Sequence, residues 1–194
     1  MFSNFIKKQM IKKTIIILFV IFCSACCGFA QNIERLNKAE IEANETPRAV
    51  AYNFVTSIIT ENYAQTVELM TLGLFFELMP DLFGEGIPIN QLFSTEYMHD
   101  IVEMRPVVKL GYEVVIVASR DIDSKEFFEE GSKYRGQPAY AFKFDCVDAN
   151  NKLYDGSHGQ YDTDVTVVVV IEEWKWKVLG LNDGKGNNLK KRTQ

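Results

Sequence analysis

The sequence predicts an α+β domain with N-terminal helices packed on an antiparallel sheet, preceded by a signal peptide. Apolar residues recur at helical spacing over the first half of residues 46–182. From residue 107 onward they alternate with polar residues, which is the period of a half-buried strand. Helices followed by a run of strands indicate one α+β domain. Residues 1–30 combine basic, apolar and small-residue stretches, as secretory signals do.

The composition suits one globular domain. The chain has 194 residues, of which 47% are apolar and 24% are charged. The formal net charge is −5, but residues 1–30 contain four lysines and no acid, so 17 basic residues remain against 26 acidic ones, a charge of −9. Such acidity disfavours nucleic acid and anionic lipid as partners. Residues 183–194 predict a disordered polar tail.

The N-terminus predicts export. Basic residues at 7–13 precede the apolar run 15–22, and Gly28-Phe29-Ala30 places small residues where a signal peptidase reads them. Cleavage after Ala30 gives a soluble protein. Alternatively, residues 23–26 (CSAC) resemble a bacterial lipoprotein box, in which Cys26 receives the lipid. A permanent membrane anchor is the third alternative, although the run is short for a hydrocarbon core of ~30 Å. We expect a periplasmic or cell-envelope protein, soluble or lipid-anchored, that meets a membrane only through that anchor.

The helices are expected in the first half of the domain. Residues 31–45 are polar and predict a linker or a loose helix. Thr46-Pro47 suits a helix start, because Thr is a good N-cap and Pro fits the first helical position. The apolar stripe that follows predicts the first helix of the domain. Asn62-Tyr63 marks a break, and residues 64–70 predict a second short helix.

A third helical stretch, residues 89–104, is expected to end at Pro106, after which the strands begin. Residues 121–138 predict a loop with one helical turn. A tight turn is expected around Glu172-Glu173 before the last strand. The segment 165–171 is apolar on both faces and is expected in the middle of the sheet. The predicted strands are 107–116, 139–147, 165–171 and 174–181.

Three segments resemble a known superfamily. Residues 49–55 (AVAYNFV) and 62–70 (NYAQTVELM) are similar to the opening of the cone-shaped α+β superfamily that includes nuclear transport factor two, ketosteroid isomerase and polyketide-cyclase-like proteins. Residues 168–178 (VVVIEEWKWKV) resemble the final hairpin of its exported bacterial branches. The resemblance covers residues 46–182 and implies a curved sheet with a pocket at the open end of the cone. No Asp here matches the base of the steroid isomerase type.

Three residues are candidates for lining a ligand pocket: His99, Tyr112 and Trp176. In an enzyme, His99 and a nearby carboxylate would supply a general base. Trp176 is expected on the same strand face as Trp174, where both would belong to the core, to a dimer interface or to a pocket. Cys146 follows Phe142 and Phe144 at every second position, beside them on one strand face, and is expected to be a buried, inert thiol.

The sequence contains no metal or cofactor motif, so we expect neither. Residues 148–153 begin like a calcium loop but have Lys152 and Leu153 where a ligand and a Gly are needed. We interpret the chain as an exported binding or protein-interaction module for a small apolar ligand or an envelope protein. One alternative is a small isomerase, dehydratase or hydrolase acting on an apolar substrate. Another is an envelope protein that forms a homodimer through its sheet.

Overall fold

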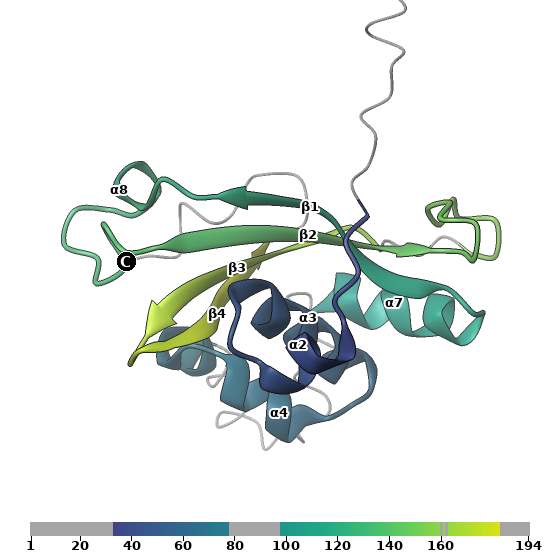
Figure 1. Ribbon diagram of the computed structural model, residues 1–194, viewed down its shortest axis with the longest axis horizontal. Helices are drawn as coiled ribbons and strands as arrows, with labels where there is room; N and C mark the ends of the chain where they lie inside the picture. Colours follow the sequence, from purple (N-terminus) through teal and green to yellow (C-terminus); the bar gives the residue numbers. More distant parts are fainter. Residues whose placement is uncertain (1–32, 78–97, 160, 162, 183–194) are drawn as a thin grey trace, which may run out of the picture. The chain divides into compact units, whose positions relative to one another are not determined.

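Helices cover one face of a four-stranded antiparallel sheet in the part of the chain that the structure describes (Figure 1). The computed structural model describes residues 33–77, 98–159, 161 and 163–182. The predicted signal peptide with Ala30 and Cys26, most of the third helical stretch and the polar tail lie outside these residues. Within them the predicted α+β class is confirmed.

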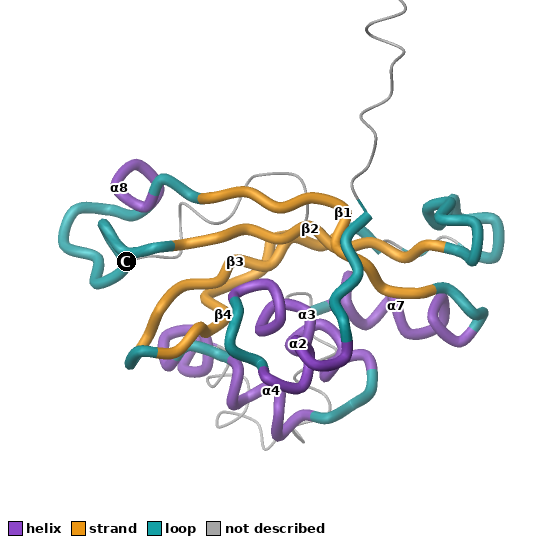
Figure 2. Tube along the Cα trace, viewed as in Figure 1, coloured by secondary structure: helices purple, strands orange, loops and turns teal. Residues whose placement is uncertain are grey.

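The strands are joined in simple sequence order, β1-β2-β3-β4, and every neighbouring pair is antiparallel. Figure 2 shows the curved sheet with α2, α3, α4 and α7 on one side. Strand β2 has the predicted bounds, and β3 lies inside the sheet as its apolar faces predict. The helices are α2 (Lys38–Ala43), α3 (Pro47–Ile59), α4 (Tyr63–Leu69), α7 (His99–Lys109) and α8 (Ser124–Phe127). The strands are β1 (Glu113–Asp121), β2 (Ala139–Val147), β3 (Val165–Glu172) and β4 (Lys175–Asn182).

Helix α3 lies at the centre of the core. Thr46 Oγ1 accepts a hydrogen bond from the Ala49 N–H at 3.2 Å, and Pro47 takes the first helical position, as predicted. Phe54 is fully buried, and burial of a side chain of this size contributes roughly 1.5–3 kcal/mol. Its core cluster includes inward-facing residues of β2 and β3, namely Phe142, Phe144, Val165, Val167 and Val169.

The opposite face of β2 and β3 is covered by the segment between β1 and β2. This second layer explains why the predicted strand 165–171 is apolar on both faces. The predicted helical turn in this segment is α8. Ile122, Phe127, Phe128 and Tyr134 pack here on Ala139, Ala141, Val168 and Val170.

The prediction that Pro106 ends the third helix, with a strand from residue 107, is wrong. Helix α7 continues through Pro106 and ends three residues later. Ile101, Met104 and Val107 recur every third residue and are all fully buried. Burial of this apolar stripe outweighs the backbone hydrogen bond that proline cannot donate. Strand β1 therefore begins six residues later than the alternation of apolar residues suggests.

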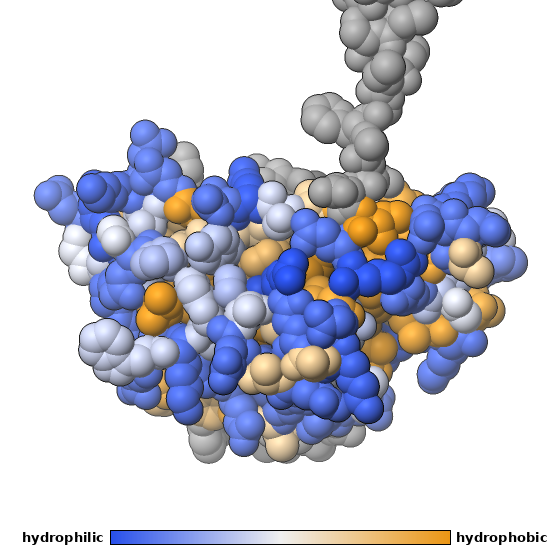
Figure 3. Space-filling view, viewed as in Figure 1, coloured by the Kyte–Doolittle hydropathy of each residue, from blue (hydrophilic) through white to orange (hydrophobic). Residues whose placement is uncertain are grey.

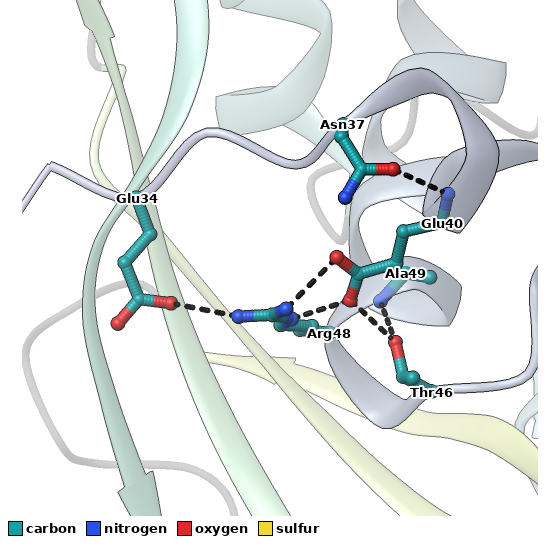
Figure 4. Close-up of polar contacts among 6 residues, drawn as sticks. All are labelled: Glu34, Asn37, Glu40, Thr46, Arg48 and Ala49. Atoms are coloured by element: carbon teal, nitrogen blue, oxygen red, sulfur yellow. Dashed lines mark hydrogen bonds and ion pairs between the residues drawn. The ribbon is translucent and has the colours of Figure 1, made fainter.

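The folded unit includes residues 33–45, for which the sequence predicts a linker or a loose helix. The backbone of Glu34 pairs with Ile116 of β1, and α2 follows. Arg48 of α3 forms ion pairs with the carboxylates of Glu34 and Glu40 (Figure 4). Its Nη2 lies 2.8 Å from Glu40 Oε2. Because the planar guanidinium matches a carboxylate, these contacts hold α2 against α3.

Candidate functional site

A groove of about 790 Å³ lies where the tip of the β3–β4 hairpin meets the helices. Three short segments line it: the α2–α3 connection, one side of α4, and the hairpin tip with the start of β4. We call this site the hairpin groove. It is open to solvent and mixes polar with apolar groups. Its lining residues are Ala43, Asn44, Glu45, Gln65, Glu68, Leu69, Trp174, Lys175, Trp176 and Lys177.

The α2–α3 connection is fixed by the buried Asn53 of α3. Asn53 Nδ2 donates to the backbone oxygen of Ile41 at 2.8 Å and to Oδ1 of Asn44 at 2.9 Å. Asn44 ends α2 with φ of 53°, a left-handed conformation that Asn tolerates. Asn53 is only 5% exposed, so these hydrogen bonds satisfy a polar group in the interior. This wall of the groove, which also carries Glu45, is therefore preformed.

Helix α4 supplies the second wall. Asn62 caps it by accepting a hydrogen bond from the Gln65 N–H, so the break predicted at Asn62 is confirmed. The buried hydroxyls of Thr66 and of Ser57 on α3 hydrogen-bond at 2.7 Å and tie the two helices together. In this orientation Gln65 and Glu68 line the groove.

The hairpin tip supplies the third wall. Glu173-Trp174 forms a two-residue turn between the paired residues Glu172 and Lys175. Both turn residues have positive φ, 51° and 67°, as a type I′ turn requires. This turn favours Asn-Gly, and a left-handed conformation costs other residues roughly 1–2 kcal/mol each. Trp174 is nevertheless placed here, and it is 98% exposed.

Two predictions about this hairpin are wrong. The turn is one residue later than the expected Glu172-Glu173, because Glu172 is still paired with Lys175 in the sheet. Trp174 therefore stands in the turn and does not share a strand face with Trp176. Trp176 is half-buried, and its ring meets that of Tyr140 edge-on with centroids 5.4 Å apart.

The base of the groove joins β4 to α4. Lys177 Nζ donates a hydrogen bond to the backbone oxygen of Glu68. One residue further along β4, the backbone oxygen of Val178 accepts a hydrogen bond from the Thr71 N–H at 2.9 Å. At Val178 the outer edge of β4 is thus paired with the chain that follows α4. The hairpin and the helix are held in a fixed relation at this end of the groove.

Charges in the groove balance. The lining contains two carboxylates, those of Glu45 and Glu68, and two ammonium groups, those of Lys175 and Lys177. Glu45 and Lys175 have no ion-pair partner among the described residues, so both are available to a ligand. On the face that Figure 3 shows, the surface over α2 and α4 is mainly hydrophilic. The hairpin groove itself places charged and amide groups beside two tryptophan rings.

The predicted pocket residues are not brought together. Trp176 lines the hairpin groove, near the start of β2. Tyr112 lies just before β1, next to the other end of β2. The nine residues of β2 span about 30 Å, so the two side chains are far apart. His99 begins α7, is 59% exposed and pairs with Glu103 at 3.0 Å. Cys146 is fully buried, as predicted, and burial raises the pKa of its thiol to about 12, which supports the prediction that the thiol is inert.

Tyr112 belongs to a cluster of tyrosines. Its ring packs edge-on against Tyr154 with centroids 5.3 Å apart, and Tyr154 contacts Tyr161 at 6.4 Å. Tyr154, Tyr161 and Asp145 border a second pocket of about 540 Å³. Within the described ranges, no three His, Cys, Asp or Glu residues are placed to hold a metal ion.

Replacing Asp145 by Asn is expected to stabilise the domain at neutral pH. Burial raises the pKa of the Asp145 carboxyl, against the hydrogen bonds that Oδ1 accepts from Thr163 Oγ1 (2.6 Å) and the Cys146 N–H (2.7 Å). Because this pKa lies above the unfolded value of about 3.9, ionisation costs stability as pH rises through the folded pKa. Asn keeps the accepting oxygen without the charge, so Tm measured by calorimetry should rise by a few degrees at pH 7.

Below about pH 4 the Asp145→Asn variant and the wild-type protein should have the same Tm, because the wild-type carboxyl is then protonated. Asp145→Ala serves as the control. It loses both hydrogen bonds and should lower Tm at either pH. A Tm difference between Asp145→Asn and wild type that stays constant from pH 4 to pH 8 would contradict the role of burial.

No protein-family model matches the sequence, and no curated protein or solved structure is significantly similar to it. The sequence singled out Trp176 as a pocket residue and left a pocket as one alternative for Trp174, but it did not indicate the other lining residues, because the three segments meet only in the folded chain. One local signal was present: Trp174 stands next to a predicted turn. Among the described residues, no helix is both long and apolar enough to cross a membrane.

Proposed function

We propose that this chain is an exported binding module that holds its ligand in the hairpin groove. One observation carries the proposal: Trp174 is 98% exposed on a turn with two left-handed, non-glycine residues, at the rim of the groove. Backbone strain of this kind is concentrated at functional sites. Tryptophan is also enriched among the residues that dominate binding energy. A complex would bury an indole that the free protein leaves in water.

The preformed walls favour binding. Asn53 and the Ser57–Thr66 pair fix the two helical walls before any ligand arrives, which lowers the ordering entropy lost on binding. Neither of the two histidines lines the groove, and His99 is paired with Glu103 at an exposed helix start. No observation therefore favours the enzyme alternative, which needs His99 as its base.

Export and superfamily membership complete the proposal. The basic, apolar and small-residue pattern of residues 1–30 supports export, with cleavage after Ala30 or lipid attachment at Cys26. The order of the elements supports membership of the cone-shaped α+β superfamily, since α3 and α4 precede and cover a curved antiparallel sheet. A homodimer through this sheet would have to leave the hairpin groove open.

Native mass spectrometry of the gently purified full chain tests the proposal. We expect a non-covalent addition to the mass measured under denaturing conditions. Trp174→Ala should lose that addition, because it removes the exposed ring from the rim. Leu110→Ala, which changes an exposed apolar residue at the end of α7, should keep it. A bare wild-type mass, or an addition that survives Trp174→Ala, would overturn the proposal.

A further inference from the structure

The groove's charges limit the class of ligand. Two carboxylates and two ammonium groups balance within the lining, so the groove has no net formal charge. Lys177 already donates to the backbone oxygen of Glu68. Nothing here would attract a polyanion or a polycation by long-range electrostatics. The lining therefore fits a neutral ligand.

The polar side chains fit a ligand rich in hydroxyl groups. Gln65 supplies donors, while its Oε1 already accepts a hydrogen bond from Asn62 Nδ2 at 3.0 Å. Glu45 and Glu68 supply acceptors, and Lys175 supplies donors. They are spread around the groove, on the α2–α3 connection, α4 and β4. A hydroxyl group both donates and accepts, so a ligand carrying several of them can satisfy this mixed set. An apolar ligand would instead strip water from these groups without replacing their hydrogen bonds.

Trp174 supplies a flat apolar surface beside these polar groups. A sugar ring has the matching character: its C–H face can stack on the indole while its hydroxyl groups point outward to the lining. The two-residue turn restricts the backbone under Trp174, so the ring is presented with less conformational freedom than in a long loop. A volume of about 790 Å³ lies within the range of sites that hold ligands of drug size, which a short oligosaccharide matches.

A peptide fits the groove less well. Extended peptides gain affinity mainly by adding a strand to an exposed sheet edge. The outer edge of β4 is occupied at Val178 by the Thr71 N–H. Apolar peptide side chains would also need an apolar pocket, whereas Trp176 is packed against Tyr140 and the remaining lining mixes apolar with charged and amide side chains.

We infer that the hairpin groove binds a neutral oligosaccharide, with one sugar ring stacked on the indole of Trp174. The inference rests on the proposed function and names the ligand class of the same site. It departs from the expectation of an apolar ligand, because the lining offers hydrogen-bonding groups on all three walls.

Tryptophan fluorescence of the full chain provides the test, because Trp174 and Trp176 are its only two tryptophans. The probes are cellohexaose, maltohexaose and chitohexaose, with a hyaluronan hexasaccharide as the charged comparison. At least one neutral probe should give a saturable blue shift, and the charged one a weaker response. Isothermal titration calorimetry, which does not need the indole as a reporter, compares the variants: Trp174→Ala should weaken binding about tenfold or more, whereas Trp174→Phe should keep most of it. Leu110→Ala, which lies outside the groove at the end of α7, should retain the shift.

The outcomes separate the two proposals. If no neutral probe binds while the native mass still shows an addition that depends on Trp174, the oligosaccharide inference fails and the binding function stands. If an extended peptide displaces the bound molecule that causes the added mass, the oligosaccharide inference fails and the binding function again stands. Neutral probe binding that is unchanged in Trp174→Ala also overturns it. If no probe binds and the native mass shows no addition, both proposals fail.

Discussion

Replacing Glu172 by Ala should lower the free energy of unfolding by about 2–4 kcal/mol. Glu172 is only 9% exposed at the end of β3, and its carboxylate joins two other segments of chain. Oε2 accepts a hydrogen bond from the Leu72 N–H at 2.8 Å. Oε1 accepts from the Tyr134 hydroxyl at 2.9 Å and from the Lys133 ammonium group. Alanine leaves these donors without their acceptor, which costs more than the hydrogen bonds themselves contribute.

The loss should depend on pH. Burial raises the pKa of Glu172, but hydrogen bonds from Lys133, the Leu72 N–H and Tyr134 together outweigh it, so the pKa lies below its usual range. A depressed folded pKa means that the stabilisation is present above the unfolded value of about 4.3 and is lost as pH falls through the folded pKa. Urea denaturation should therefore show a large deficit for Glu172→Ala at pH 7 and a smaller one in acid.

Two further variants isolate the cause of this loss. Glu172→Gln keeps one accepting oxygen without the charge and should fall between wild type and Glu172→Ala. Glu173→Gln removes the adjacent, exposed carboxylate and should change stability by no more than about 0.5 kcal/mol. An equal, small effect of Glu172→Ala and Glu173→Gln would mean that the carboxylate of Glu172 does not hold these segments together.

Elements with strong local signals were predictable. Thr46-Pro47 fixed the start of α3, since a cap and a first-turn proline act within a few residues. Strand β2 followed from alternation, and the central position of β3 followed from two apolar faces. The burial of Cys146, on the same strand face as Phe142 and Phe144, was predictable from the alternation of β2.

The errors arose where tertiary contacts override local preference. Pro106 marks a helix end in most contexts, but the buried stripe from Ile101 to Val107 keeps α7 intact. The turn at Glu173-Trp174 lacks the Asn-Gly signal of its type, so alternation extended the last strand one residue too far. The hairpin groove was invisible for a different reason, since contacts such as Lys177 with Glu68 join residues 109 positions apart.

Changing the turn to Asn-Gly, by Glu173→Asn with Trp174→Gly, should stabilise the protein and abolish ligand binding. Both residues have positive φ, and the replacements adopt it more readily, so a gain of roughly 1–2 kcal/mol in unfolding free energy is expected. Trp174 is 98% exposed, so its removal sacrifices little packing in the free protein. Urea denaturation measures the gain, and native mass spectrometry measures the loss of the bound ligand.

Glu173→Asn alone is the matched control, because it relieves part of the strain and leaves the indole in place. It should bind as wild type does and gain a fraction of the stability. No gain in either variant would show that the turn is not strained, whereas full binding by the double variant would show that Trp174 is not needed. A gain in stability together with a loss of binding would mean that the turn residues serve the groove at the expense of the fold, a trade-off common at functional sites.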